Sequence, residues 1–263
     1  KVPAGVFNLI NGIGPVVGEA MSAHPDIDMM SFTGSTRGGI AVAKASANSV
    51  KRVSQELGGK SANIVLDDDA FESSIRKGVS LCMNNTGQSC NAPTRMLIPS
   101  GRKLEAYEIA RKTAEQVIVG DPREDSTVVG PLVSAVQYDK VQSLIEAGLE
   151  EGATLLTGGA GKPDGLDRGY YAKPTVFGDV KNDMTIAREE IFGPVLSVIA
   201  YDDIDDAVAI ANDTDYGLAA YVSGQDKDML TAIGRRLRAG QVHINYGSGG
   251  ADAPFGGYKQ SGN

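Results

Sequence analysis

The alternation of short apolar runs with helical stretches constrains the fold of this chain more than any other feature of its sequence. This order is typical of parallel sheets whose faces are covered by helices. The predicted strands span residues 6–10, 29–33, 62–66, 95–99, 195–201, 219–223 and 241–245. The predicted helices span residues 40–50, 71–83, 104–119, 136–150, 205–211 and 227–239. The sequence therefore predicts a parallel-sheet α/β protein.

Composition narrows the class of partner and the compartment. The chain has 263 residues, 41% of them hydrophobic, which is enough for one large or two modest domains. Its net charge of -8 argues against nucleic-acid and anionic-membrane partners, because both need clustered Lys and Arg. The two cysteines, Cys82 and Cys90, have neither a disulfide pattern nor a metal-ligand spacing. We therefore expect no metal, no membrane span and a reducing compartment, with the cytoplasm as the default.

Cys90 is the candidate nucleophile. It ends the run Asn-Thr-Gly-Gln-Ser-Cys at residues 85–90, a small-residue loop between a predicted helix and the strand that begins at Arg95. The ordinary alternative for a free thiol is a small buried hydrophobe, and Cys82, in an apolar part of the preceding helix, fits that alternative better. Little of an unperturbed thiol is ionised near neutral pH, so Cys90 needs a neighbouring base or a favourable dipole.

Three further motifs accompany this loop. They are Gln-Glu-Leu-Gly-Gly-Lys at 55–60, Glu-Glu-Ile-Phe-Gly-Pro at 189–194 and Pro-Phe-Gly-Gly-Tyr-Lys-Gln-Ser-Gly at 254–262. In this order, together with the Cys90 loop, they resemble the aldehyde dehydrogenase superfamily of the NAD(P)-dependent, acid-forming kind. The resemblance covers nearly the whole chain and implies that the sequence is truncated at both ends.

The resemblance implies part of a Rossmann-like nucleotide-binding domain and an α/β catalytic domain, with the active site between them. Residues 1–58 would be the C-terminal half of the NAD(P)-binding domain, 59–246 the catalytic domain, and 247–263 a substrate-pocket and interdomain segment. Gly58 and Gly59 form the predicted hinge. The chain has no initiator Met and no signal-peptide pattern, so we expect it to begin inside a domain. The resemblance implies that it lacks one oxyanion donor and half of the nucleotide-binding sheet, so we expect it to be nearly inactive by itself.

Glu56 is the candidate base. Gly58 and Gly59 leave room beside it for a water and a substrate, and partial desolvation would raise its pKa toward a useful range. The alternative is a surface carboxylate at a strand end. The family pattern assigns Glu56 to activating the water that hydrolyses the acyl-enzyme. Because family members that transfer the acyl group to coenzyme A tend to lack this glutamate, its presence favours release of a free acid.

The predicted cofactor contacts combine local sequence pattern with the resemblance. Gly34 and Ser35 lie in a glycine-rich turn between a strand and a helix, where backbone amides can approach a phosphate, and the resemblance makes this turn the pyrophosphate site. Gly14 would give the adenosine end close backbone access. In the family pattern, Glu190 binds the nicotinamide ribose and Phe192 packs against the cofactor. The sequence does not distinguish NAD from NADP.

The remaining predicted site residues support the nucleophile loop or line the substrate pocket. The residues expected to support the nucleophile loop are Asn85, Gly87, Gln88 and Arg95. Those expected in the substrate pocket are Ser89, Asn91 and Phe255. The oxyanion donor available here is the backbone N–H of Cys90, and the resemblance implies a second donor, an asparagine upstream of residue 1. His24 and His243 stand far apart, and neither is expected to be catalytic.

The expected reaction is oxidation of a small-molecule aldehyde to a carboxylic acid through a cysteine thiohemiacetal and thioester. The protein would be a homodimer or homotetramer when complete. One alternative is a noncatalytic truncated domain that binds a nucleotide or a partner chain, in which Cys90 would show no special reactivity. Another is a cysteine thioesterase or acyl transferase, which would need no nicotinamide cofactor. The sequence does not identify the aldehyde.

Overall fold

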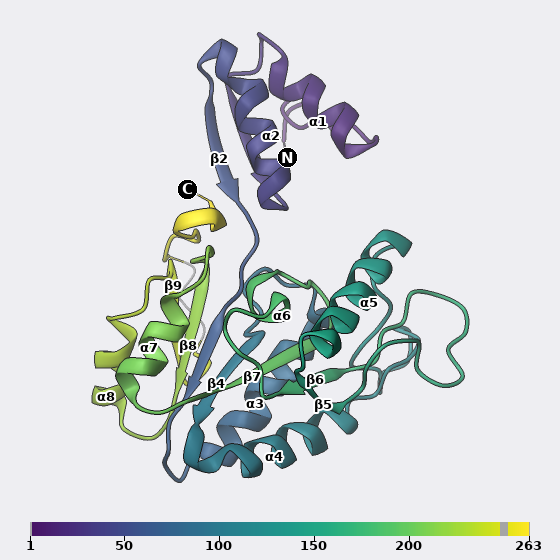
Figure 1. Cartoon of the computed structure of the whole chain (residues 1–263). Helices are drawn as coiled ribbons and strands as arrows, with labels where there is room; N and C mark the ends of the chain where they lie inside the picture. Colours follow the sequence, from purple (N-terminus) through teal and green to yellow (C-terminus); the bar gives the residue numbers. More distant parts are fainter. Residues whose placement is uncertain (1, 248–251, 263) are drawn as a thin grey trace.

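The computed structural model describes residues 2–247 and 252–262, and it confirms the α/β class. A two-stranded sheet pairs β1 with β2, and a seven-stranded sheet has the order β5-β6-β7-β4-β3-β8-β9 (Figure 1). Strand pairs are parallel except β5 with β6, which is antiparallel. Residues 248–251, within the predicted C-terminal segment, lie outside the described residues.

The strands are β1 (Met29–Thr33), β2 (Arg52–Glu56), β3 (Ala62–Val65), β4 (Arg95–Pro99), β5 (Thr154–Thr157), β6 (Thr175–Gly178), β7 (Val195–Tyr201), β8 (Ala219–Ser223) and β9 (Gln241–Ile244). The α-helices are α1 (Gly14–Ala23), α2 (Thr36–Ser46), α3 (Phe71–Met83), α4 (Lys103–Glu115), α5 (Ala135–Glu150), α6 (Thr185–Arg188), α7 (Ile204–Asn212) and α8 (Lys227–Gly234).

The larger sheet is covered on both faces, which explains its continuous apolar strands. Along β4, Met96 and Ile98 pack in one core with α3 and α4, whereas Leu97, between them, packs in a second core with α7 and α8. A third core lies under α5 and α6. Side chains of one strand alternate between the two faces, so a single strand contributes to both cores.

The smaller unit consists of α1, α2 and the β1–β2 pair, and it lies above the larger one in Figure 1. The two strands are in register from Met29 opposite Arg52 to Thr33 opposite Glu56, with α2 as the crossover. After β2 the chain runs straight down into the larger sheet. The C-terminal segment returns to this crossing, where Leu57 N–H donates to Ser261 O at 2.9 Å and Ser261 Oγ donates to Gly58 O at 2.7 Å.

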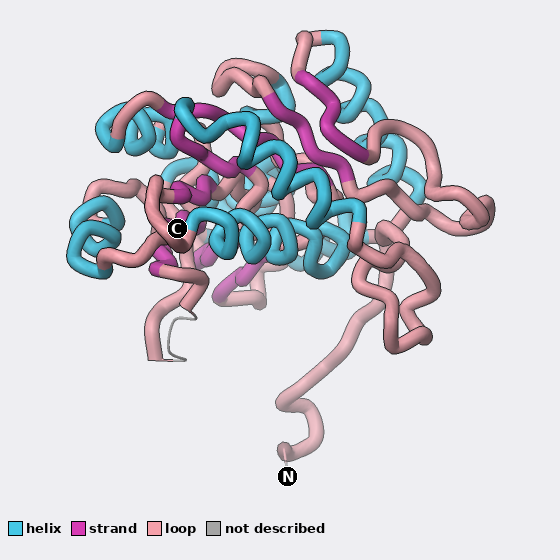
Figure 2. Tube along the Cα trace, turned by 90° about the horizontal axis from the view of Figure 1, so that it is seen from below, coloured by secondary structure: helices cyan, strands magenta, loops and turns pink. Residues whose placement is uncertain are grey.

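One predicted strand is wrong. Residues 6–10 form an exposed loop, in which the side chains of Val6, Phe7, Leu9 and Ile10 are 65% to 77% exposed. Figure 2 shows the N-terminal trace extending away from the helices and strands. An apolar run becomes a strand only when a neighbour shares its backbone hydrogen bonds, and no described strand lies beside it.

Other differences concern missed strands and helix ends. β2, β5 and β6 were not predicted, because β2 is polar and the other two flank the glycine-rich stretch. The helix predicted at 40–50 begins at Thr36, since the Ser35 side chain caps it, and ends at Ser46. The helix predicted at 104–119 ends at Glu115, and the one predicted at 227–239 ends at Gly234.

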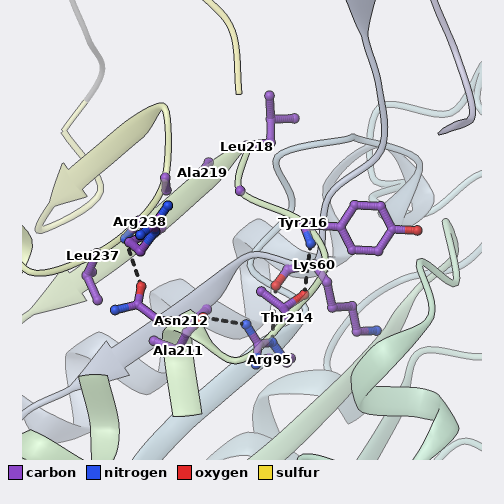
Figure 3. A pocket seen from close by; sticks show the side chains of 14 residues that line it. Lys60, Arg95, Ala211, Asn212, Thr214, Tyr216, Leu218, Ala219, Leu237 and Arg238 are labelled. Carbon is purple, nitrogen blue, oxygen red and sulfur yellow. Dashed lines mark hydrogen bonds between the residues drawn. The ribbon is translucent and has the colours of Figure 1, made fainter. Parts of the chain in front are cut away.

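The Arg95 side chain connects the segment that follows Gly59 to the core (Figure 3). The side chain is fully buried, and its Nε donates to Lys60 O at 3.1 Å. Its terminal nitrogens donate to Asn182 Oδ1 at 2.8 Å and to the carbonyls of Ile210 and Ala211 at 2.9 Å. Burial, with the charge of Arg188 second, lowers the pKa of Arg95 to about 10, so the guanidinium remains charged at neutral pH. These contacts tie β4 and the end of α7 to the segment that follows Gly59.

We expect Arg95→Met to lower the free energy of unfolding by about 3 to 5 kcal/mol, because it leaves several buried acceptors without a donor. The measurement is urea unfolding of the chain followed by circular dichroism. The matched control is Arg111→Met, which removes an arginine whose pairs with Glu108 and Glu115 are on the surface of α4. Surface pairs contribute little, so a similar loss in both variants would contradict the anchoring role.

Candidate active site

A cleft of about 440 Å³ opens between the N-terminus of α2, the crossing after β2 and the Cys90 loop. Its lining residues are Thr33, Gly34, Ser35, Glu56, Leu57, Gly58, Gln88, Ser89, Cys90, Asn91, Gln137, Lys140, Glu190 and Phe192. The structure thus brings the glycine-rich turn at Gly34 and Ser35 together with residues from the motifs at 55–60, 85–90 and 189–194. Gly14 and Phe255 are not among the lining residues: Gly14 is an exposed first residue of α1, and Phe255 is 49% exposed.

The glycine pair at the centre of the cleft allows three backbone segments to meet. A β-carbon on Gly58 would lie 2.5 Å from Glu190 Oε2, and one on Gly59 would overlap the carbonyl oxygen of Cys90. Real β-carbons do not make such contacts, so any larger residue would push these groups apart. The lack of side chains at Gly58 and Gly59 therefore determines how closely the Glu190 carboxylate and the Cys90 loop approach each other.

Cys90 is half-buried, whereas Cys82 is fully buried in α3. Burial raises the pKa of the Cys90 thiol, and the charges of Glu190 and Glu56 raise it further. Hydrogen bonds from the backbone N–H groups of Cys90 and Asn91 act in the opposite direction and lower this pKa. Burial raises the pKa of Cys82 to about 12, as expected for a core residue. Of the two thiols, only Cys90 has both access to solvent and donors for its ionised form.

The loop before Cys90 has an unusual backbone. Residues 85–87 all have left-handed φ, from 51° at Asn85 to 69° at Gly87. The Asn85 side chain donates to Gln88 O at 2.9 Å, and the Gln88 side-chain oxygen accepts from Val133 N–H at 2.9 Å. A β-carbon on Gly87 would overlap the carbonyl of Gly193. Asn85, Gly87 and Gln88 are therefore placed to fix the shape of the loop.

Glu56 ends β2 and faces the cleft. Its Oε2 is buried and has no hydrogen-bond partner among the described residues. Burial raises the pKa of this carboxyl above its usual range. A carboxylate oxygen with a raised pKa and no partner is suited to accept a proton from a water or a thiol in the cleft.

Glu190 and Phe192 are held by α5, a helix that the sequence analysis did not connect with the site. Glu190 Oε1 accepts from Gly59 N–H at 3.0 Å, while Lys140 Nζ donates to its main-chain oxygen at 2.6 Å. Gln137 Nε2 donates to Phe192 O at 2.9 Å, and Phe192 has a φ of 57°, which is rare for a large side chain. Burial raises the pKa of Glu190. Gln137 and Lys140 resemble the other polar residues of an amphipathic helix, so no pattern in the sequence predicts this role.

The N-terminus of α2 forms the far end of the cleft. Ser35 caps the helix, its Oγ accepting from Gly38 N–H at 3.2 Å, which leaves the hydroxyl hydrogen free to donate. Gly34 N–H donates to Glu56 O at 3.0 Å, so it serves the turn and not a ligand. A β-carbon on Gly34 would lie 2.7 Å from the Phe32 ring, so close packing against this ring accounts for a glycine at this position. The first free amides of α2 remain available to an anion such as a phosphate.

Within residues 2–247 and 252–262 no group of His, Cys, Asp and Glu side chains could hold a metal ion. No helix of that described part is long and apolar enough to cross a membrane.

Comparison with known proteins identifies the class to which this fold and cleft belong. The family model described as Aldehyde dehydrogenase family matches residues 1–263. The chain belongs to this family. It is 53% identical over 262 residues to a 3-succinoylsemialdehyde-pyridine dehydrogenase from a Pseudomonas species, covering 100% of this chain and 55% of the relative. The chain thus spans about half the length of the curated relatives that it matches.

Solved structures agree with the fold. A mutant of Aldehyde Dehydrogenase C from Pseudomonas syringae, complexed with NAD+ and octanal, is 56% identical with a TM-score of 0.98, covering 100% of this chain and 54% of that one. A betaine aldehyde dehydrogenase variant from Staphylococcus aureus in complex with NAD+ is 35% identical with a TM-score of 0.92, covering 96% of this chain and 52% of that one.

We expect iodoacetamide to alkylate Cys90 well before Cys82 in the folded chain, because the Cys82 thiol is inaccessible and has the pKa of a core group. Peptide mass spectrometry at timed intervals would measure both rates. In concentrated guanidinium chloride the two rates should become similar, which serves as the control. Equal rates in the folded chain, or faster labelling of Cys82, would contradict the described burial.

Proposed function

We propose that the full-length protein oxidises an aldehyde to a carboxylic acid with NAD(P)+, using Cys90 as nucleophile and Glu56 as base. The observation that carries this proposal is the single cleft in which Cys90, Glu56 and Glu190 face one another beside the N-terminus of α2. Family membership and relatives of similar fold that were solved with NAD+ support it.

The first half of the reaction belongs to Cys90. Its ionised Sγ attacks the aldehyde carbon, so that a C–S bond forms and the carbonyl oxygen takes the electron pair. The backbone N–H of Cys90 is available as one donor to that oxygen. Bound NAD(P)+ supplies the acceptor for the hydride of the former aldehyde carbon. The Cys90 side chain then carries the acyl group as a thioester.

The second half belongs to Glu56. Its unpartnered Oε2 accepts a proton from a water, and the resulting hydroxide attacks the thioester carbon. The C–S bond breaks, the acid leaves and the sulfur recovers a proton. Since the raised pKa of Glu56 keeps more of it protonated in mildly acidic solution, this step should slow as the pH falls toward that pKa.

The residues present fit a dinucleotide. An unpartnered carboxylate oxygen, Gly58 and a capped helix N-terminus line the cleft that leads from Cys90 to α2. Ser35 and the first amides of α2 would hold the pyrophosphate. Glu190 would accept hydrogen bonds from ribose hydroxyls, and Phe192 would pack against the nicotinamide end.

The aldehyde itself is defined only as a class. Relatives carry names or ligands as different as 3-succinoylsemialdehyde-pyridine, octanal and betaine aldehyde. Ser89 and Asn91, which flank Cys90, are the proposed substrate contacts among the lining residues. A cytoplasmic location and a homodimer or homotetramer remain predictions. A thioesterase or acyl transferase is disfavoured, because such an enzyme has no use for the part of the cleft between Glu190 and α2.

We expect Glu56→Gln in the full-length protein to slow steady-state turnover by roughly 10²- to 10⁴-fold while leaving one rapid burst of reduced cofactor. The burst survives because hydride transfer precedes hydrolysis. Stopped-flow absorbance of reduced cofactor measures both phases. Cys90→Ser is the control and should lose burst and turnover together, since its hydroxyl stays protonated without a strong base.

Loss of the burst in Glu56→Gln, with Cys90 still reactive toward iodoacetamide, would move Glu56 to an earlier step as base for the thiol. Turnover of Cys90→Ser within tenfold of the wild type would overturn the nucleophile assignment.

A further inference from the structure

Tyr221 lies on β8, directly beneath the nucleophile loop, and the mechanism above does not use it. Its side chain is buried, with 4% of the residue exposed. The hydroxyl donates to the main-chain oxygen of Asn91 at 2.9 Å. Asn91 follows Cys90 immediately, and the structure thus attaches the residue next to the thiol to the central sheet.

The same stretch of backbone supplies the donors to the sulfur. The backbone N–H groups of Cys90 and Asn91 both lower the pKa of the thiol, because they favour its ionised form. Tyr221 therefore holds the carbonyl of the residue whose N–H helps to stabilise the ionised sulfur. A displacement of the Asn91 backbone that breaks the bond to Tyr221 would also move this N–H relative to the sulfur.

Two neighbouring aromatic rings restrict the orientation of the Tyr221 ring and therefore the position of its hydroxyl. His243 is its cross-strand partner on β9, and the two rings stack with centroids 4.7 Å apart and 18° between their planes. The His243 ring is itself fixed by a hydrogen bond of 2.7 Å between Nδ1 and Gly247 O. On another side Tyr246 approaches, with ring centroids 6.0 Å apart, and its hydroxyl donates to Ser74 O at 2.6 Å.

We propose that Tyr221 is a positioning residue for the nucleophile: its hydroxyl, held in place by the stacked His243 ring, orients the Asn91 backbone so that two N–H groups point at Cys90 Sγ. This inference rests on the proposed role of Cys90. Tyr221 is not itself a lining residue of the cleft, and it contacts the nucleophile loop through the main chain of Asn91.

Other charged groups near the thiol must stay constant in any test. Glu56 from β2 and Glu190 from the loop after α6 disfavour the thiolate, and Lys140 from α5 lines the same cleft. Tyr221 from β8 is the remaining titratable group facing Cys90, and burial raises its pKa to about 12. Tyr221→Phe changes none of the first three, and Tyr221 is neutral over the range in which a thiol is titrated.

The test is the rate of Cys90 alkylation by iodoacetamide as a function of pH, measured on the chain by peptide mass spectrometry without aldehyde or cofactor. We expect Tyr221→Phe to move the midpoint of the pH profile upward and to slow alkylation near neutral pH by about three- to tenfold. One unit in a thiol pKa is a tenfold change in thiolate well below the midpoint. His243→Ala, which keeps the hydroxyl but removes the stack, should shift the midpoint in the same direction by less.

Tyr201→Phe is the matched control. Tyr201, on β7, is also 4% exposed and also donates to a main-chain oxygen at 2.9 Å, but to Val65 of β3. Both phenylalanine variants should lose similar thermal stability, and only Tyr221→Phe should change the alkylation profile. An unchanged or lowered midpoint in both Tyr221→Phe and His243→Ala, or an equal shift in Tyr201→Phe, overturns the proposal. Because no turnover is measured, these outcomes are independent of whether the full-length protein oxidises aldehydes.

Discussion

The contact on which the rest of this site depends is the approach of the Gly58–Gly59 backbone to Glu190 and to the Cys90 loop. No side chain fits between these three segments. The approach is possible because each segment is anchored elsewhere: Arg95 binds the chain just after Gly59, Lys140 and Gln137 bind the Glu190 loop, and Ser261 binds Gly58. The cleft is thus assembled by backbone contacts, and the reactive side chains project from them.

This assembly places like charges beside the thiol. Two carboxylates and partial burial all favour the neutral form of Cys90, and only backbone N–H groups of the loop oppose them. A thiol held mostly neutral at rest is a poor target for oxidation and for stray electrophiles. The proposed nucleophile would therefore depend on loop geometry for its reactivity, which is a physical reason for the left-handed backbone at 85–87 and for the hydrogen bond from Tyr221 to Asn91.

Strong local signals in the sequence predicted much of the fold. β4, β7, β8 and α3 begin and end at the predicted residues, because each is a continuous apolar or amphipathic run bounded by turn residues. The failure at residues 6–10 has the opposite cause, since an apolar run without a neighbouring strand has nowhere to place its hydrogen bonds. β2, which carries Glu56, was missed because its residues are polar.

The candidate site was predictable where residues form contiguous motifs and unpredictable where they meet only in space. Cys90, Glu56, Glu190 and Phe192 belong to such motifs, and the structure brings them into one cleft. Gln137 and Lys140, on α5, bind the loop that carries Glu190 and Phe192. Tyr221, on β8, binds the main chain of Asn91. None of these three has a sequence pattern that sets it apart from neighbouring polar or aromatic residues. Their roles follow from strand order and helix placement.

The most direct test of the central claim is to identify the atom that carries the acyl group. The full-length protein with Glu56→Gln would be mixed with NAD+ and an aldehyde that the wild type oxidises, quenched in acid within the first turnover, digested and analysed by tandem mass spectrometry. The account predicts one acyl group per active site, attached to Cys90 and released by neutral hydroxylamine. Formation of reduced cofactor with no acyl group on Cys90, or with the acyl group on another residue, would contradict it.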